Sequence, residues 1–125
     1  MSFVVQKKDE KRYALLAFKG GVTISELEES RRALKDIALA SNGYRKIIVD
    51  MQEASLAAST LDIHQFFASN KVEPPTACLI AVVVNPNNWA DALFAENVAR
   101  NHGICLRVFR NDFHARAWLG IADSH

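Results

Sequence analysis

The sequence predicts an α/β fold built on one five-stranded, mostly parallel sheet, with an antiparallel N-terminal strand and four helices. Two observations lead to this prediction. After Gly20, strand-like apolar runs alternate with segments of helical spacing, which is typical of parallel strands joined by right-handed crossovers. Before it, two strand-like runs are separated only by a short polar gap, which favours an antiparallel hairpin. A chain of 125 residues fits a single domain, taken as residues 1–125.

The N-terminal part predicts this hairpin followed by a helix. Residues 3–7 are rich in valine, and residues 13–18 are apolar enough to be buried on both faces of a sheet. We expect Gly20 and Gly21 to end the second strand. Thr23 and Glu26 have the spacing of a capping box, which predicts that the first helix begins there.

The middle of the chain predicts a third strand and a second helix. Residues 46–51 are mostly apolar and β-branched, which predicts a strand. Residues 52–58 are mostly small and are expected to form a loop. Ser59 is the expected N-cap of the second helix, and Pro74 and Pro75 prevent that helix from continuing.

The C-terminal part predicts two further strand–helix units. Residues 76–84 form the most hydrophobic run and are expected to be a strand near the middle of the sheet. A turn at 85–88 precedes a third helix that begins near Trp89. Residues 104–109 are the fifth expected strand, and the last helix is expected to open on Asn111 or Asp112 as its cap.

Apolar side chains in this last unit are expected to lie in the core. Phe113, Ala117 and Ile121 are spaced to share one face of the last helix. That face is extended by Ala115, Trp118, Leu119 and Ala122. Cys78 and Cys105 both fall inside predicted strands and are interpreted as small buried hydrophobes.

Composition and charge exclude several classes of function. The net charge is +1, from 15 basic and 14 acidic residues, so the chain lacks the basic surplus expected of a nucleic-acid-binding protein. The longest apolar run, residues 77–84, is far shorter than the roughly 20 residues that span a membrane. The N-terminal segment has none of the features of a secretion signal. We therefore expect a cytoplasmic protein with no membrane span.

The C-terminal unit resembles the closing unit of SpoIIAA-like proteins, which are small bacterial proteins related to the STAS domains of anti-sigma-factor antagonists. The resemblance rests on the strand 106–109, the turn Asn111-Asp112 and the ending Ala115-x-x-Trp118-Leu119. Residues 14–20 with Val22 and Thr23 are similar to the family's second strand and first helix start, and residues 48–51 to its third strand. The resemblance implies a SpoIIAA-like (STAS-like) fold and a non-enzymatic bacterial regulatory module that binds a protein partner.

Two other folds of this length fit less well. A dinucleotide-binding fold needs a glycine-rich turn after its first strand, and this sequence has none. A response-regulator receiver would use Asp50 at the end of the third strand. However, such a receiver also needs an acidic pair after its first strand and a lysine after its last one. Here Asp9 and Glu10 lie in the hairpin, and the last strand is followed by Arg110 and Asn111.

Polar residues are predicted to gather at the carboxyl ends of the strands, where ligands bind in open parallel sheets. The competing interpretation is that most of them are helix caps and turn residues. No catalytic residue, metal ligand or cofactor is predicted. The candidate partner- or ligand-binding residues are Asp50, Asn85, Asn111 and Asp112, with Thr23 beside them.

Ser59 is the sharpest candidate, as a phosphorylation site. The resemblance implies it, because a serine at this place in anti-sigma-factor antagonists is phosphorylated by a partner kinase. A phosphate at a helix start meets free N–H groups and the positive end of the helix dipole. The family motif has Asp before the serine and Ser-Gly after it, whereas this chain has Ala58 and Thr60-Leu61. The competing interpretation is a plain N-cap.

The leading hypothesis is therefore an interaction module that docks its second helix onto a protein partner. The alternative is a protein that binds a small apolar or lipid-like ligand, in a pocket lined by residues 54–58, Phe66, Phe67 and Trp89. A homodimer is also predicted, because the short first strand leaves a sheet edge without an obvious cover.

Overall fold

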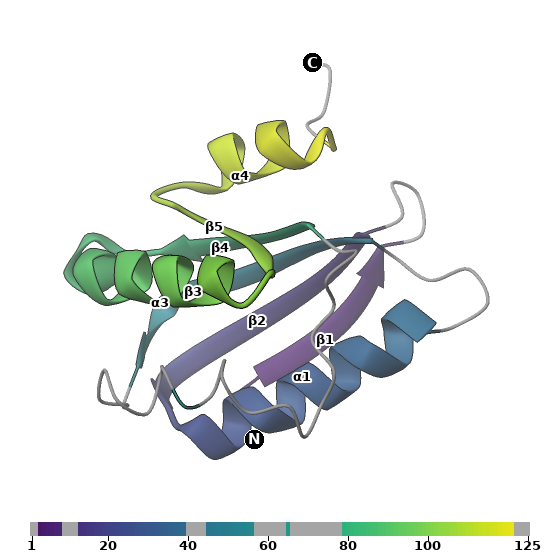
Figure 1. The fold of residues 1–125 in the computed structure, drawn as a ribbon, viewed down its shortest axis with the longest axis horizontal. Coiled ribbons are helices and arrows are strands. Elements are labelled where there is room, and N and C mark those ends of the chain that lie inside the picture. The colour runs from purple at the N-terminus through teal and green to yellow at the C-terminus, as the bar shows by residue number, and fades with distance from the viewer. Residues whose placement is uncertain (1–2, 9–12, 40–44, 57–64, 66–78, 122–125) are drawn as a thin grey trace.

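A computed structural model describes residues 3–8, 13–39, 45–56, 65 and 79–121. In these residues a five-stranded sheet has the strand order β1-β2-β3-β4-β5 (Figure 1). The first strand is antiparallel to the second, and all other neighbours are parallel, as predicted. The strands are β1 Phe3–Lys8, β2 Tyr13–Val22, β3 Lys46–Leu56, β4 Leu79–Val84 and β5 Cys105–Phe109.

Three α-helices lie within the described residues, where the sequence predicted four for the whole chain. They are α1 Ile24–Leu39, α3 Trp89–Asn101, which follows the short 3₁₀ turn η1 Pro86–Asn88, and α4 Asp112–Leu119. The helix expected to begin at Ser59 falls outside the described residues except for Gln65, which is helical. Among the described residues, no helix is both long and apolar enough to cross a membrane.

The helices are divided between the two faces of the sheet. Each parallel strand is added on the same side of the one before it, so right-handed crossovers place α1 and α3 on the same face. The last helix, α4, is not a crossover and lies against the opposite face (Figure 1). This arrangement gives the sheet two separate apolar layers.

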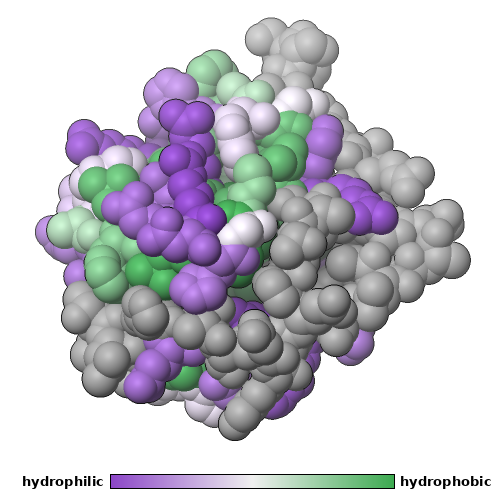
Figure 2. Space-filling view, viewed as in Figure 1, coloured by the Kyte–Doolittle hydropathy of each residue, from purple (hydrophilic) through white to green (hydrophobic). Residues whose placement is uncertain are grey.

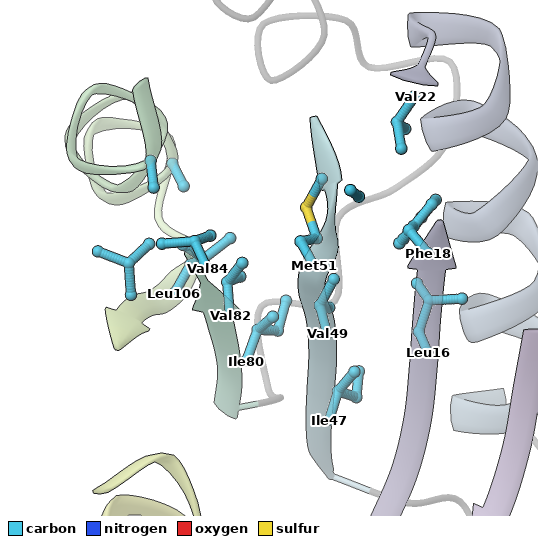
Figure 3. Packing of buried hydrophobic residues seen from close by; sticks show 14 of the residues in the cluster. Leu16, Phe18, Val22, Ile47, Val49, Met51, Ile80, Val82, Val84 and Leu106 are labelled. Atoms are coloured by element: carbon cyan, nitrogen blue, oxygen red, sulfur yellow. The ribbon is translucent and has the colours of Figure 1, made fainter. Parts of the chain in front are cut away.

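The larger layer lies between the sheet and the helices α1 and α3. On the face shown in Figure 2, hydrophobic and hydrophilic side chains are interspersed. Inside, side chains of four strands meet beneath the two helices (Figure 3), and burial of each large one contributes roughly 1.5–3 kcal/mol. The smaller layer lies under α4. Ala14 and Leu16 of β2 belong to the larger layer and Tyr13 to the smaller one, which confirms that β2 is buried on both faces.

Two strands are longer than predicted. Gly20 and Gly21 were expected to end the second strand, but β2 continues through them to Val22. Residues 52–56, expected to be loop, belong to β3. Both predictions were wrong for one reason: the two segments pair with each other, and this pairing outweighs the low strand propensity of glycine and small residues. Gly20 has φ 70°, a left-handed conformation that glycine adopts without strain.

A β-bulge in β3 precedes this extension. Two positions separate Ala17 from Lys19 on β2, whereas three separate their partners Asp50 and Glu53 on β3. One extra residue on β3 shifts the alternation of its side chains by one position. The buried residues of β3 that face the larger layer accordingly follow the pattern Ile47, Val49, Met51 and then Ala54.

In the C-terminal unit, Ala115, Leu119 and Ile121 are buried as predicted, whereas the predicted burial of Phe113, Ala117 and Cys105 was wrong. Phe113 is 71% exposed, because the buried face of α4 is formed by Ala115 and Leu119, and Phe113 lies about 200° around the helix from Ala115. Cys105 is exposed on the edge strand β5. Trp118 is partly buried against the smaller layer, and its ring lies 5.7 Å from that of Phe109. Cys78 falls outside the described residues.

Candidate functional site

The first predicted site residue, Thr23, is a helix cap. It follows β2 directly and forms the expected capping box with Glu26. The Glu26 N–H donates to Thr23 Oγ1 over 3.2 Å, and Glu26 Oε1 accepts from the Thr23 N–H over 3.4 Å. These bonds satisfy N–H groups that the first turn of α1 would otherwise leave free. The capping box is confirmed.

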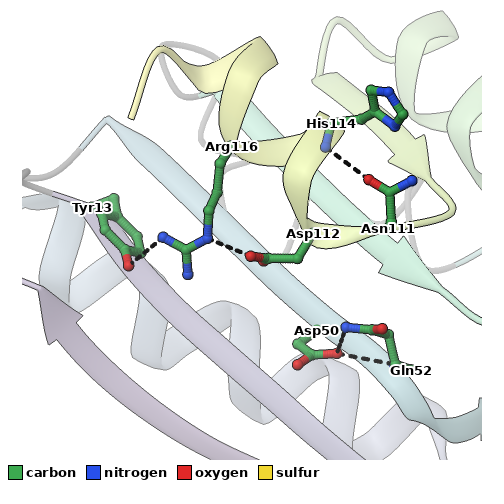
Figure 4. A network of polar contacts seen from close by, with 7 residues as sticks. All are labelled: Tyr13, Asp50, Gln52, Asn111, Asp112, His114 and Arg116. Carbon is green, nitrogen blue, oxygen red and sulfur yellow. Dashed lines mark hydrogen bonds and ion pairs between the residues drawn. The ribbon is translucent and has the colours of Figure 1, made fainter. Parts of the chain in front are cut away.

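Asp50 lies within β3 at the bulge, and not at the carboxyl end of the strand as predicted. Its Oδ1 atom accepts from the backbone N–H of Gln52 at 3.0 Å and from the Gln52 side-chain amide at 3.3 Å (Figure 4). A bulge leaves a backbone group without its ladder partner, and a short carboxylate side chain can take its place. Asp50 therefore stabilises the irregular part of the strand.

Asn85 follows β4 and binds the backbone of β3. Its amide nitrogen donates to the carbonyl oxygens of Gln52 at 3.1 Å and Ala54 at 3.4 Å. Asn88 donates to the same Ala54 oxygen at 2.7 Å. Since β4 ends opposite Met51, these carbonyls lie beyond the last strand pairing on that side, and the asparagine amides replace the missing strand.

One buried atom of this group has no partner among the described residues. Asn85 Oδ1 is buried and has no hydrogen bond in the part of the chain that the structure describes. A carbonyl oxygen of this kind accepts readily from an N–H or O–H donor. A hydrogen-bond donor from outside the Asp50–Asn85 group could therefore bind Asn85 Oδ1.

Asn111 and Asp112 form a second group, at the start of α4 (Figure 4). The Oδ1 atom of Asn111 accepts from the His114 N–H at 2.8 Å, so Asn111 is the N-cap of the helix. Asp112 binds the guanidinium of Arg116 over 2.5 Å, and Arg116 also donates to the hydroxyl of Tyr13 over 2.8 Å. Burial opposes the charge on Arg116, but its bonds with Tyr13 and Asp112 outweigh this, so the pKa of its guanidinium lies above its usual value.

The predicted residues therefore fall into separate groups. Asp50 and Asn85 both bind the backbone of Gln52. The Gln52 N–H donates to Asp50, and the Gln52 carbonyl oxygen accepts from Asn85. The Asn111–Asp112 group lies on the α4 side of the sheet, as does Asp50 (Figure 4). Thr23 belongs to α1, and Ser59 lies outside the described residues. Within the described ranges, no three His, Cys, Asp or Glu side chains are grouped in a way that could hold a metal ion.

The residues proposed to line an apolar pocket have other roles where the structure describes them. Ala54 is 3% exposed and belongs to the larger layer of the core. Trp89 packs against the same layer, and the guanidinium of Arg110 covers its ring at 4.6 Å. Phe66 and Phe67 fall outside the described residues.

The arrangement of the whole chain is similar to a known structure. No family model matches the sequence, and no curated protein matches it. The structure matches the crystal structure of an anti-sigma factor antagonist from Mycobacterium paratuberculosis with a TM-score of 0.60. The match covers 95% of this chain and 93% of that one, at 9% sequence identity. The chain has the SpoIIAA-like fold. This confirms the fold that the C-terminal unit and the first strands had indicated.

The two edges of the SpoIIAA-like sheet differ. At the β5 edge, the Val108 N–H donates to Oε1 of Glu96, from α3, at 2.8 Å, and the Leu106 N–H donates to the Ile104 carbonyl at 3.1 Å. At the β1 edge, no described side chain binds the strand backbone, and Val4 is 57% exposed. The β5 edge is therefore closed to another strand, whereas in the described ranges nothing outside β2 binds the backbone of β1.

Sequence reasoning missed several residues that form these groups. Asn88 and Glu96 bind the backbone of strands distant in sequence, and the carbonyl of Gln52 is bound by the distant Asn85, so nothing local marks these contacts. Arg116 could have been found, because it follows Asp112 by four positions on a predicted helix, the spacing of a helical ion pair.

Proposed function

We propose that this protein is a non-enzymatic bacterial regulatory module that binds a protein partner in the cytoplasm, with residues 1–125 acting as one SpoIIAA-like domain. The observation that carries the proposal is the match of nearly the whole chain to the fold of an anti-sigma factor antagonist. The roles of Asp50, Asn111 and Asp112 support the non-enzymatic part of the proposal. Each of these side chains binds the chain's own backbone or an arginine.

The proposed control point is Ser59, at the start of the second predicted helix. A phosphate there would add about two negative charges close to free N–H groups. The partner would dock on that helix and the loops beside it, so the added charge would alter the docking surface directly. An intact-mass measurement of the protein purified from its own cells tests whether a phosphate is present.

Two substitutions separate a switch from a cap. Aspartate is itself a good N-cap, so Ser59→Asp keeps the helix start and adds a charge, whereas Ser59→Ala removes the cap at a cost of about 0.5–2 kcal/mol. If Ser59 is a switch, Ser59→Asp changes the amount of partner captured from a lysate while the melting temperature stays near that of the wild type. Equal capture by both proteins, with a loss of stability in Ser59→Ala, would leave Ser59 as a cap only.

We further propose that the protein forms a homodimer through β1. The free backbone groups of this strand can pair with the same strand of a second copy, which would join two sheets into one. The contrast with the β5 edge, where Glu96 and Ile104 bind the outward N–H groups, supports β1 as the edge that is used.

A further inference from the structure

The junction of β5 and α4 carries an exposed aromatic side chain and, close to it in sequence, two exposed arginines. Phe113 is 71% exposed, the largest exposed fraction among the large hydrophobic residues that the structure describes. Arg107 and Arg110 precede it on the same strand and turn, and both are exposed. Hydrophobic and strongly hydrophilic side chains also lie next to each other over this part of the molecule in Figure 2. We call residues Arg107, Arg110 and Phe113 the β5–α4 patch.

The two arginines are held in place without neutralisation. The guanidinium of Arg107 lies 5.7 Å from the centre of the Phe109 ring, and that of Arg110 lies 4.6 Å from the Trp89 ring. Such cation–π contacts orient the side chain but leave its charge and its N–H donors available. In the described residues neither arginine has an ion pair with a carboxylate.

The carboxylates beside the patch are already used. Asp112 is bound to Arg116, and Glu96 accepts from the Val108 N–H. Among the described residues, the two positive charges therefore have no carboxylate partner, and the apolar ring of Phe113 is exposed to water. A partner that supplies carboxylates and an apolar side chain would complement both features.

The edge of β5 also limits how a partner can bind here. Its outward N–H groups at Leu106 and Val108 are bound within the chain, so a partner strand cannot be added to it. A partner that binds at this junction must therefore be recognised by side chains. Preoriented arginines favour this, because little side-chain entropy is lost when they bind.

We propose that the β5–α4 patch binds an acidic segment of a protein partner, with an apolar side chain of that segment resting on Phe113. This surface is distinct from Ser59 and the second predicted helix, so it goes beyond the proposed function and does not depend on phosphorylation. An anionic membrane fits less well. Two arginines contribute only about 2 kcal/mol to binding at a lipid surface, and the chain as a whole has a net charge of only +1.

Peptide binding tests the proposal directly. The probes are a synthetic amphipathic peptide with leucine on one face and glutamate on the other, and the same peptide with glutamine at every glutamate position. The chain has two tryptophans, so in a Trp118→Phe background Trp89 is the sole tryptophan and reports on contacts at Arg110. We expect the acidic peptide to change Trp89 fluorescence in a saturable way and to bind more weakly as the salt concentration is raised. The glutamine peptide should bind at least about tenfold more weakly than the acidic one.

Variants assign the binding to the patch. Arg110→Gln and Phe113→Ser should each weaken binding of the acidic peptide about tenfold or more, the effect expected of a central contact residue. Arg32→Gln, which changes an exposed cation on α1, is the matched control and should leave binding unchanged. Urea unfolding of each variant confirms that it is folded.

Three outcomes would overturn the proposal. The first is failure of the acidic peptide to bind the wild type, or equal binding of the glutamine peptide. The second is binding to phosphatidylserine vesicles that Phe113→Ser abolishes while peptide binding persists, which would assign the patch to a membrane. The third is a dimer that Phe113→Ser dissociates, which would assign it to a second copy. None of these outcomes bears on Ser59, so this inference and the proposed function fail separately.

Discussion

Arg116 in α4 donates a hydrogen bond of 2.8 Å to the hydroxyl of Tyr13 at the start of β2, across 103 positions of sequence. The same guanidinium lies 5.2 Å from the centre of the Tyr13 ring and binds Asp112 on its own helix. Tyr13 is 6% exposed and belongs to the smaller apolar layer. This contact therefore fastens the last helix to a strand that is not its neighbour in sequence.

Replacing Arg116 is expected to loosen α4. Arg116→Met keeps an unbranched apolar chain but removes the bonds to Tyr13 and Asp112, and we expect a loss of about 1–3 kcal/mol in the free energy of unfolding. Tyr13→Phe removes the hydroxyl alone and should cost about 1 kcal/mol. Urea unfolding measures both. A loss below about 0.5 kcal/mol in both variants would mean that the contact is not stabilising.

Glu96 is expected to protect the β5 edge. In Glu96→Ala the Val108 N–H loses its acceptor, so we expect a loss of about 1–3 kcal/mol and self-association that grows with concentration. Glu96→Gln keeps an oxygen acceptor at the same place and serves as the matched control. Sedimentation velocity over a range of concentrations distinguishes them, and identical behaviour of the two variants would refute the role of Glu96.

Asp50 is expected to hold the bulge in β3. Asp50→Ala removes the acceptor of the Gln52 N–H, so the free energy of unfolding should fall by about 1 kcal/mol. The amide of Gln52 should also exchange its hydrogen faster, because the bulge opens locally. Asp50→Asn retains an oxygen and should exchange at nearly the wild-type rate. Unchanged exchange at Gln52 in Asp50→Ala would contradict this account.

The homodimer prediction can be tested at Val4. A lysine on an edge strand opposes pairing with another edge, so Val4→Lys should convert a dimer to a monomer at micromolar concentration. Stability within the monomer should change little, because Val4 is 57% exposed. Leu93→Lys, at an exposed apolar position on α3, is the control and should leave the dimer intact. A wild type that sediments only as a monomer would reject the prediction.

Much of the fold could be predicted because its signals are local. The capping box of Thr23 and Glu26, the apolar runs of the strands and the start of α3 at Trp89 all depend on residues close together in sequence. The extensions of β2 and β3 could not be predicted in this way. Gly20, Gly21 and the small residues near Ala54 have low strand propensity, and only their pairing with each other keeps them extended.

The site was harder to predict than the fold for the same reason. The sequence placed Asp50 and Asn85 near the carboxyl ends of the strands, but it could not show that both bind Gln52. Asn85 reaches Gln52 from 33 positions away, and Glu96 reaches Val108 from 12. Phe113 was expected in the core because its spacing matched Ala117 and Ile121. The position of the sheet relative to α4 decides which face is buried, and no local pattern contains that information.

The strand order has a consequence for how the chain assembles during synthesis. Every strand pairs with the one made just before it, so each strand that leaves the ribosome meets a finished edge on which to add. No later strand has to insert between two earlier ones, so the nascent sheet grows in one direction. Among the bonds of the described residues, the one between Tyr13 and Arg116 spans nearly the whole length of the chain. It can close only after the last helix has emerged, so it marks the completion of the fold.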